Sequence, residues 1–168
     1  MALRHILTQG DPALAKKCRP VSDFNAHLAQ LLDDLGDTLL ESGGVGLAAP
    51  QVGVLRRVVV VLETNVGEDE DEILYELVNP EIIEQSGSQT GAEGCLSVPG
   101  VYGVVTRPDY VKVRAYDRDG ELFEVEGHGL TARCFCHEID HLDGHLFTEK
   151  AARFLSPEEV AAESEEEE

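Results

Sequence analysis

The residues best suited to chemistry stand together at positions 137–141, which read His-Glu-Ile-Asp-His. Side chains four residues apart lie on one face of an α-helix, so His137 and His141 can close on a single cation. Glu138 would stand beside that cation, free to move a proton. The same pattern also arises by chance, and a histidine pair on a helix is often only packed or solvated. The segment therefore suggests a catalytic metal site and needs a further ligand to support it.

A catalytic metal centre of this kind uses three protein ligands and keeps one position open. Downstream of His141, the acidic residues and His145 stand in no recognisable ligand setting. Upstream, residues 93–97 read Glu-Gly-Cys-Leu-Ser and offer the thiol of Cys95. A thiolate with two imidazoles suits iron(II), zinc, cobalt or nickel. Taken alone, Cys95 can equally be a small buried hydrophobe, the common fate of a free cysteine.

A third segment, Gly-Val-Gly-Leu-Ala-Ala-Pro-Gln at 44–51, is a tight run of small residues that ends in one amide side chain. Its glycines allow the backbone to approach something bulky, such as a substrate chain. Gln51 is a neutral donor that can face a developing oxyanion. The alternative is an ordinary glycine loop that ends a helix, a task for Gly43 and Gly44. The segment fits a phosphate-binding loop poorly, because the Walker pattern is missing and residues 18–111 contain no lysine.

In this order and at these separations, the three segments resemble the motifs of peptide deformylase. The family reads G-x-G-L-A-A-x-Q, E-G-C-L-S and Q-H-E-x-D-H, and the chain matches the first two in full at 44–51 and 93–97. In the third, Cys136 stands where the family usually has glutamine. Residues 10–12 and 104–108 also look like the family, so the resemblance covers about residues 4–155.

The resemblance implies a metal-dependent hydrolase that removes the formyl group from the N-terminal formyl-methionine of newly made polypeptides and releases formate. It implies one divalent ion per chain, with water or hydroxide in the open position, and three ligands: Cys95, His137 and His141. Fe²⁺ is the family's usual ion, while the residues themselves leave Zn²⁺, Ni²⁺ and Co²⁺ open.

The resemblance also implies the catalytic groups. Glu138 takes a proton from water and passes it to the leaving amine. The Gln51 side chain and the backbone N–H of Leu96 stabilise the charge that forms on the formyl oxygen. By the same resemblance the methionine slot has these residues: Val45, Gly46, Leu130, Cys134 and the ring of His137, with Gly91 leaving room. Each of them is equally explicable as core.

Two acidic residues, Glu93 and Asp140, are candidates to orient the metal ligands from behind. The alternative for them is a surface ion pair, for example between Glu93 and Arg107. Cys136 puts one such orienting contact in doubt and is also a further thiol open to oxidation.

Composition limits the class of protein. A chain of 168 residues with 42% hydrophobic residues is long enough for one domain that buries about 70% of its unfolded surface. No run approaches the ~20 apolar residues of a membrane helix, and the N-terminus does not resemble a signal peptide. The four cysteines (18, 95, 134 and 136) form no disulfide framework, which favours a reducing, cytoplasmic location.

The formal net charge of −20 argues against binding nucleic acid and leaves contact with the ribosome unsupported. Acidic residues concentrate at 63–76, expected to be a solvated loop, and at 158–168. We therefore divide the chain into a catalytic domain, residues 1–157, and an acidic C-terminal tail, residues 158–168, that is frayed or disordered.

The elements that must position these residues follow from periodicity. A helix capped by Ser22 or Asp23 is expected to run to about Ser42, with a stripe of leucines at 28, 31, 32, 35 and 39. The valine-rich residues 57–62 predict a buried strand, and the motif helix should span residues 130–142 after the glycines of 127–129. Further strands are expected at 74–78, 82–85, 103–106, 110–116 and 122–125, with a hairpin turn at 117–120 and a last short helix capped at 156–159.

A strand-rich middle between helices predicts an α+β single domain, in agreement with the family. Short mixed or antiparallel sheets should pack around a central helix that carries His-Glu-x-x-His, with an N-terminal helix and a short C-terminal helix.

Two rival functions remain open on the sequence. A zinc peptidase with the same helix motif would cut internal peptide bonds and would not need Cys95. A metal-stabilised protein that binds nascent chains would have a closed site, with Cys134 or Cys136 as the fourth ligand.

Overall fold

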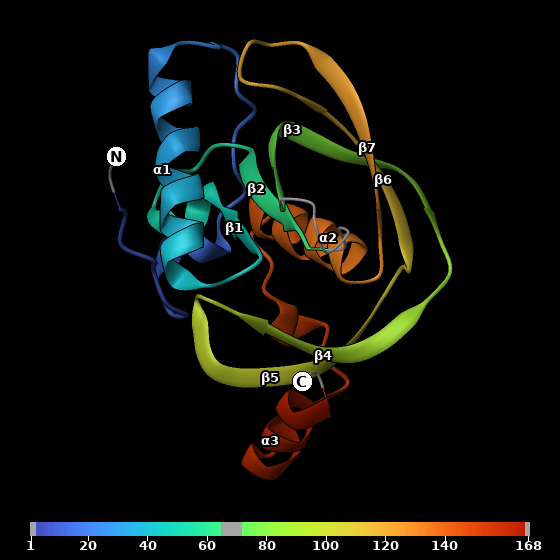
Figure 1. Ribbon diagram of the computed structural model, residues 1–168. Coiled ribbons are helices and arrows are strands. Elements are labelled where there is room, and N and C mark those ends of the chain that lie inside the picture. Colours follow the sequence, from blue (N-terminus) through green and yellow to red (C-terminus); the bar gives the residue numbers. More distant parts are fainter. Residues whose placement is uncertain (1–2, 65–71, 167–168) are drawn as a thin grey trace.

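The run of four valines at residues 58–61 organises the fold, because strand β2 (Val58–Glu63) buries both of its faces. The computed structural model describes residues 3–64 and 72–166. Val58 and Val60 pack against α1 (Ala26–Ser42), whereas Val59 and Val61 pack on the other side against α2 (Leu130–Leu142). The predicted strand at 57–62 is therefore confirmed, and it places α2 in the centre of the molecule (Figure 1).

Two antiparallel sheets surround α2. The larger has the strand order β1-β2-β3-β6-β7 and the smaller β4-β5-β8. The remaining strands are β1 (Gly46–Ala48), β3 (Ile73–Ser86), β4 (Gln89–Cys95), β5 (Val98–Arg107), β6 (Tyr110–Tyr116), β7 (Leu122–His128) and β8 (Arg153–Phe154). Short 3₁₀ helices lie at η1 (Pro12–Ala15), η2 (Ala49–Val52) and η3 (Phe147–Glu149). The architecture confirms the predicted α+β class with the motif helix at its centre.

Helix α1 has the predicted stripe of buried leucines but a different cap. The Oδ1 of Asn25 accepts a hydrogen bond of 3.1 Å from the N–H of Leu28, so Asn25 caps the helix rather than Ser22 or Asp23. Asn25 stands three residues before Leu28, the first leucine of the stripe, and a cap at this distance reaches an otherwise unpaired N–H. The helix ends at Gly43, whose φ of 76° is the left-handed conformation expected of a C-terminal glycine.

Strand β3 is one continuous element where the sequence predicted two, at 74–78 and 82–85. Asn79 has φ 52°, and the pairing with β6 shifts register between Val78 and Glu81. The Asn79 side chain bonds both backbone groups of Val21, at 2.8 and 2.9 Å. The irregularity at Asn79 is therefore a bulge held by a side chain, and it bends the strand without ending it.

The acidic C-terminus begins as a capped helix, α3 (Pro157–Glu166). Ser156 Oγ accepts from the N–H of Glu159, and the Glu159 carboxylate accepts from the N–H of Ser156, both at 3.2 Å. This reciprocal pair stabilises the start of a helix, so the last short helix expected at 156–159 is present. It continues to Glu166 through residues that we expected to be frayed. The separate-tail division at residue 158 stays a prediction. Residues 65–71, half of the acidic segment 63–76, lie outside the described residues. The expectation of a loop is wrong at both ends of that segment, because Glu63 ends β2 and Ile73 begins β3. In the part of the chain that the structure describes, no helix is long and apolar enough to cross a membrane.

Candidate active site

One face of α2 carries the predicted chemistry, because Leu130, Cys134, His137 and His141 recur at helical spacing. The opposite face packs into the core through Ala132, Phe135, Ile139 and Leu142. Both histidines of the motif are buried. The sheet therefore fixes the rotation of α2 and turns the imidazoles toward the smaller sheet.

Cys95 reaches these imidazoles from the end of β4. It pairs with Val98 of β5, so Leu96 and Ser97 form a tight turn between the two strands. The Sγ of Cys95 lies 3.4 Å from Nε2 of His141, which lies 3.2 Å from Nε2 of His137. The three ligand atoms all lie within 4.8 Å of one another.

The two shorter of these distances match the spacing of donor atoms around a tetrahedral metal ion. Bonds of about 2.3 Å to sulfur and about 2.0–2.1 Å to nitrogen place the donors roughly 3.6 and 3.3 Å apart at tetrahedral angles. Within residues 3–64 and 72–166, this cluster comprises Cys95, His137 and His141, and neither Cys134 nor Cys136 belongs to it. The donor set is therefore suited to one divalent ion with a position left open.

The electrostatics of the cluster also favour a cation. Burial alone would lower the pKa of His137, but Glu138, Cys95 and Glu93 together raise it to about 10. Burial and the charge of His137 hold the pKa of His141 well below its usual value. The negative groups that favour a proton on His137 would favour a metal ion in the same place.

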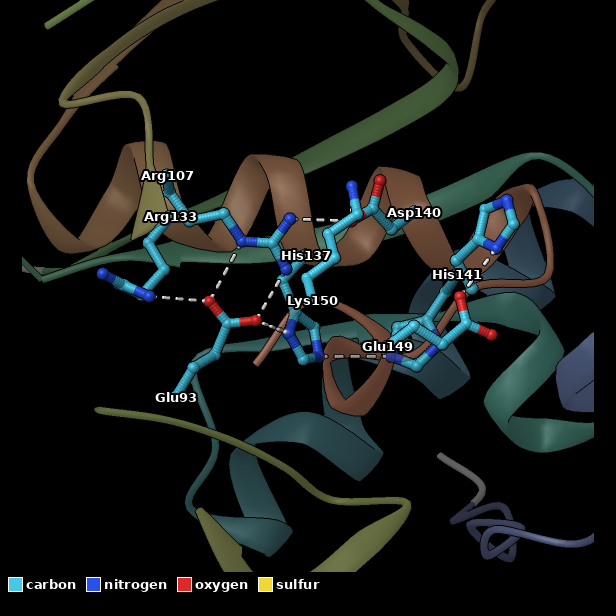
Figure 2. A network of polar contacts seen from close by, with 9 residues as sticks. Glu93, Arg107, Arg133, His137, Asp140, His141, Glu149 and Lys150 are labelled. Atoms are coloured by element: carbon cyan, nitrogen blue, oxygen red, sulfur yellow. Dashed lines mark hydrogen bonds and ion pairs between the residues drawn. The ribbon is translucent and has the colours of Figure 1, made fainter. Parts of the chain in front are cut away.

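Glu93 holds His137 in position. Its Oε2 accepts from Nδ1 of His137 at 2.7 Å and from Nη2 of Arg107 at 2.7 Å. Its Oε1 accepts from Nε of Arg107 at 3.2 Å and from Nη1 of Arg133 at 2.9 Å. Figure 2 shows this carboxylate surrounded by the three side chains. With Nδ1 occupied by Glu93, the neutral ring of His137 presents the Nε2 lone pair to a metal.

The alternative expected for Glu93 was an ion pair with Arg107 on the surface. Arg107 is indeed the partner, but the pair is buried. Both side chains are 4% exposed. Burial alone would raise the pKa of Glu93, but hydrogen bonds from His137 and Arg107 hold it well below the usual range. Asp140 contacts neither imidazole and instead accepts from Nη1 of Arg107 at 2.7 Å and lies 3.0 Å from Nζ of Lys150. It supports Glu93 through Arg107.

The amide of Gln51 is oriented by its own turn. Its Oε1 accepts from the N–H of Ala48 at 2.9 Å, which leaves Nε2 to donate to Oγ of Ser97 at 3.1 Å. The same Nε2 lies 3.6 Å from Sγ of Cys95. The side chain is therefore a fixed donor next to the ligand cluster.

Glu138 lies directly against the backbone of Gly46. A Cβ at Gly46 would stand 2.5 Å from Oε2 of Glu138, so only glycine leaves room for the carboxylate. Among the described residues, Oε1 of Glu138 and Nδ1 of His141 are the buried side-chain atoms without a hydrogen-bond partner. Burial raises the pKa of Glu138 to about 7, although the charge of His137 opposes the rise. A buried carboxyl group with this pKa can carry a proton in either direction near neutral pH.

A cavity of about 560 Å³ opens beside these groups. It is lined by the candidate site residues Val45, Gly46, Gln51, Glu93, Cys95, Leu96, Leu130, Cys134, His137 and Glu138. Gly91, expected to leave room for the substrate, is not part of this lining. Arg133 was not identified from the sequence. It is buried in the cavity wall and forms an ion pair of 2.9 Å with Glu93. Arg133 lies four residues before His137, and this helical spacing is the feature of the sequence that could have identified it.

The two remaining thiols near the site are not activated. Burial raises the pKa of Cys136 to about 11 and that of Cys134 still further. Both stay protonated at neutral pH, which lowers their reactivity toward oxidants and metals. The departure from the family at Cys136 leaves the ligand cluster intact.

The fold and the site together define a class of protein. A small α+β chain that gathers two imidazoles, one cysteine sulfur and an adjacent carboxylate beside a cavity has the arrangement of a hydrolase that uses a metal ion.

Comparison with known proteins narrows this class to one family. The family model described as polypeptide deformylase matches residues 3–156. The peptide deformylase of Caldanaerobacter subterraneus is 52% identical over 160 residues, which cover 95% of this chain and 96% of that protein. Peptide deformylase 1 of Bacillus subtilis is 51% identical over 161 residues, covering 96% and 98%. A crystal structure of a peptide deformylase from Legionella pneumophila matches with a TM-score of 0.80 and 43% identity, over 98% of this chain and 92% of that chain. The chain therefore belongs to the polypeptide deformylase family.

Enzymes of this family are hydrolases that remove the N-terminal formyl group from formylmethionyl polypeptides during protein biosynthesis, and this chain is an enzyme of that kind. The prediction made from the three motifs is confirmed at this level.

Proposed function

We propose that the enzyme hydrolyses the formyl group of N-formylmethionyl nascent peptides at a single divalent metal ion held by Cys95, His137 and His141. The spacing of these three donors beside Glu138 and Gln51 is the observation that supports the proposal most directly. The ion that we propose is Fe²⁺, on the resemblance to the family, with Zn²⁺, Ni²⁺ and Co²⁺ as substitutes that the donor set accepts.

A bound divalent ion supplies Lewis-acid activation of water and of the formyl carbonyl. Glu138 receives the proton of the attacking water. It delivers this proton to the amino nitrogen of the methionine as the bond between that nitrogen and the formyl carbon breaks. The products are then formate and a free amino terminus. Burial raises the pKa of Glu138 above its usual range, which suits the carboxyl group to both halves of this transfer.

Gln51 and Leu96 stabilise the charge that develops on the formyl oxygen. The Nε2 of Gln51 is held in place through Ala48 and Ser97, and the N–H of Leu96 belongs to the tight turn after Cys95. Donors fixed before the reaction need no reorganisation, and each is typically worth ~3–4 kcal/mol of transition-state stabilisation.

The methionine side chain enters the part of the cavity that Val45, Leu130 and Cys134 line, with Gly46 beside the catalytic carboxylate. We place the enzyme in the cytoplasm, because a thiolate ligand requires a reducing compartment. The acidic charge supports neither direct nucleic-acid binding nor a docking contact with the ribosome.

The decisive experiment measures formate released from formyl-Met-Ala-Ser by protein prepared without oxygen. We expect turnover by the wild type and a loss of ~100- to 10,000-fold in Glu138→Ala with the metal retained. Cys95→Ser should lose the metal, whereas Cys18→Ser, the same change at a buried thiol outside the cavity, should keep both metal and activity.

Each rival function gives a different result. Activity that survives Cys95→Ser would favour a peptidase that does not need the thiolate. A wild type that binds metal but releases no formate would favour a binding protein.

A further inference from the structure

A second cavity, of about 350 Å³, lies at the opposite end of α1 from the active site. The active-site cavity is lined by Ser42 and Gly43 at the C-terminal end of this helix, whereas the second cavity is lined by Leu28 and Leu31 in its first turns. A helix of 17 residues is about 25 Å long, so the two cavities are separate sites (Figure 1). The hydrolysis proposed above gives the second cavity no part.

The buried part of the lining of this second cavity is aliphatic. Val21, Leu28 and Leu31 are only 5–6% exposed, and Val54 is half-buried. The polar residues that line the cavity stand around them at the surface. A concave surface of this size, with an apolar floor and a few polar groups, suits a small organic ligand.

Arg56 is exposed at the edge of this cavity, and a second arginine stands next to it. A parallel β-bridge pairs Arg56 with Arg19. Around it, the N–H of Arg19 donates to the carbonyl of Leu55 at 3.1 Å, and the N–H of Arg57 donates to the carbonyl of Arg19 at 3.0 Å. Residues paired in this way are lateral neighbours whose side chains leave the backbone on the same side. The two like charges therefore repel each other.

No carboxylate of the described residues neutralises these two arginines, although the chain carries 33 acidic residues against 13 basic ones. The other basic residues of residues 3–64 and 72–166 form salt bridges with carboxylates, whereas Lys16, Lys17, Arg19 and Arg56 form none. Asp23 also lines the cavity, but it forms no salt bridge with Arg56 in the described part of the chain. The unpaired cations are thus confined to two segments that the bridge brings together, beside an apolar cavity.

We propose that this second cavity binds a phosphate monoester with a small apolar body. The phosphate group lies at Arg56 and Arg19, and the apolar body covers the aliphatic floor. Guanidinium groups bind phosphate oxygens through paired hydrogen bonds. A phosphate monoester carries a charge of about −1.5 to −2 at pH 7, which matches two neighbouring cations better than a single carboxylate does. The ligand removes the repulsion between the two arginines and takes apolar surface out of water.

The test is a calorimetric titration of the metal-loaded full chain with three probes: hexyl phosphate, inorganic phosphate and hexanol. We expect the Kd of hexyl phosphate to be at least ~10-fold lower than that of inorganic phosphate, because burial of about two methylene groups gives a change of this size. Hexanol, which lacks the charge, should bind at least ~10-fold more weakly than hexyl phosphate.

Substitutions separate the two parts of the site. Arg56→Gln should weaken the binding of hexyl phosphate by ~10-fold or more. Arg114→Gln is the matched control, because Arg114 is also an exposed arginine but pairs with Glu81, and this variant should bind as the wild type does. Val54→Phe fills the cavity, so the Kd of hexyl phosphate should rise to that of inorganic phosphate. Val54→Met serves as a second filling variant if Val54→Phe does not fold.

A further titration with AMP identifies the source of the ligand. Tighter binding of AMP than of hexyl phosphate would indicate a nucleotide, and tighter binding of hexyl phosphate would indicate an aliphatic phosphate such as a lipid fragment. Both results agree with a site for phosphate monoesters, provided that Arg56→Gln weakens the binding.

Three results would overturn the proposal. A wild type that does not bind hexyl phosphate has no such site, and equal Kd values for hexyl phosphate and inorganic phosphate would mean that the cavity contributes nothing. An unchanged Kd in Arg56→Gln would mean that the phosphate binds elsewhere, for example at the metal ion. None of these measurements depends on the release of formate, so the proposed function stands or falls separately.

Discussion

At the scale of single residues, the site depends on the absence of a side chain at Gly46 as much as on the side chains that carry the chemistry. Gly46 contributes no atom to the chemistry, yet its bare Cα is what allows Glu138 to lie against β1. The carboxylate is then fixed by steric contact as well as by the helix that carries it. A shift of about 1 Å in such a group can cost ~100-fold in rate.

We therefore predict that Gly46→Ala lowers kcat by about 100-fold while the metal content stays unchanged. The added Cβ would stand 2.5 Å from Oε2 and 2.9 Å from Cγ of Glu138, so the carboxylate must move. Steady-state formate release together with metal analysis measures both effects.

A double mutant identifies the cause. If Gly46→Ala acts through Glu138, then adding it to Glu138→Ala should lower the residual rate no further. Losses that multiply in the double mutant would show that Gly46 acts on something else, such as the substrate chain.

The sequence predicted that Cys95, His137 and His141 come together, and it named Arg107 as a possible partner of Glu93, but it did not reveal that this pair is buried. Two histidines four residues apart on one helix can be recognised from the sequence, because the helix sets the distance between them. The contact between Glu93 and His137 joins residues 44 positions apart, and the contact between Glu93 and Arg133 joins residues 40 positions apart, so both depend on how β4 meets α2. No local pattern contains these distances, so neither the burial of Glu93 nor its ion pair with Arg133 can be predicted from the sequence.

At the scale of elements, Arg107 joins the smaller sheet to the central helix. It lies at the end of β5 and donates to Glu93 on β4 and to Asp140 on α2. The hairpin of β4 and β5 carries Cys95, whereas α2 carries both histidines. The relative placement of the three metal ligands therefore depends on a contact between elements that one arginine makes.

We predict that Arg107→Ala lowers the free energy of unfolding by ~3–5 kcal/mol, because it leaves the buried carboxylate of Glu93 short of a partner. Arg114→Ala is the matched control, since Arg114 pairs with Glu81 on the surface, where 44% and 64% of the two side chains are exposed. Such an exposed pair should contribute no more than ~1 kcal/mol. Urea unfolding monitored by circular dichroism gives both values.

The metal provides a second readout for the same pair of variants. Arg107→Ala should also bind the ion more weakly, and Arg114→Ala should bind it as the wild type does. Similar losses of stability in the two variants would contradict a special role for Arg107 between the sheet and the helix.

The elements themselves were predictable to different degrees. The valine run and the leucine stripe each bury a continuous apolar surface, so β2 and α1 could be placed within a few residues. Helix α2 could be placed from the histidine motif and the glycines that precede it. Strand β4 was missed, because its sequence Gln-Thr-Gly-Ala-Glu-Gly-Cys has no apolar alternation and becomes a strand by pairing with β5. A strand that forms because it pairs with a neighbouring strand cannot be recognised from the pattern of its own residues.

At the scale of the whole molecule, charge is the dominant feature. The chain carries 33 acidic and 13 basic residues. Figure 1 shows α3, the start of the acidic C-terminus, projecting beyond β5 at the edge of the molecule. The surface pairs of Arg118 with Asp33 and Glu76, at 2.9 and 2.6 Å, offset a small part of the excess. Repulsion among the remaining carboxylates should destabilise the compact state.

We predict that added salt stabilises this protein. Raising NaCl from about 10 to 100 mM shortens the Debye length from ~30 to ~10 Å, which screens repulsion between carboxylates more than it weakens short ion pairs. A gain on the order of 1 kcal/mol would raise the melting temperature by roughly 2–4 °C. Thermal unfolding of the full chain, followed at several salt concentrations with the metal content held constant, measures the slope.

A chain that ends at Ser156 tests where the repulsion originates. It keeps the part that the family model matches and removes seven of the 33 acidic residues. If the acidic residues after Ser156 contribute to the repulsion, the melting temperature of this shorter chain should rise less with salt than that of the full chain. A melting temperature that falls with salt in the full chain would mean that ion pairs such as those of Arg118 outweigh the repulsion, and the charge excess would then have no cost to stability.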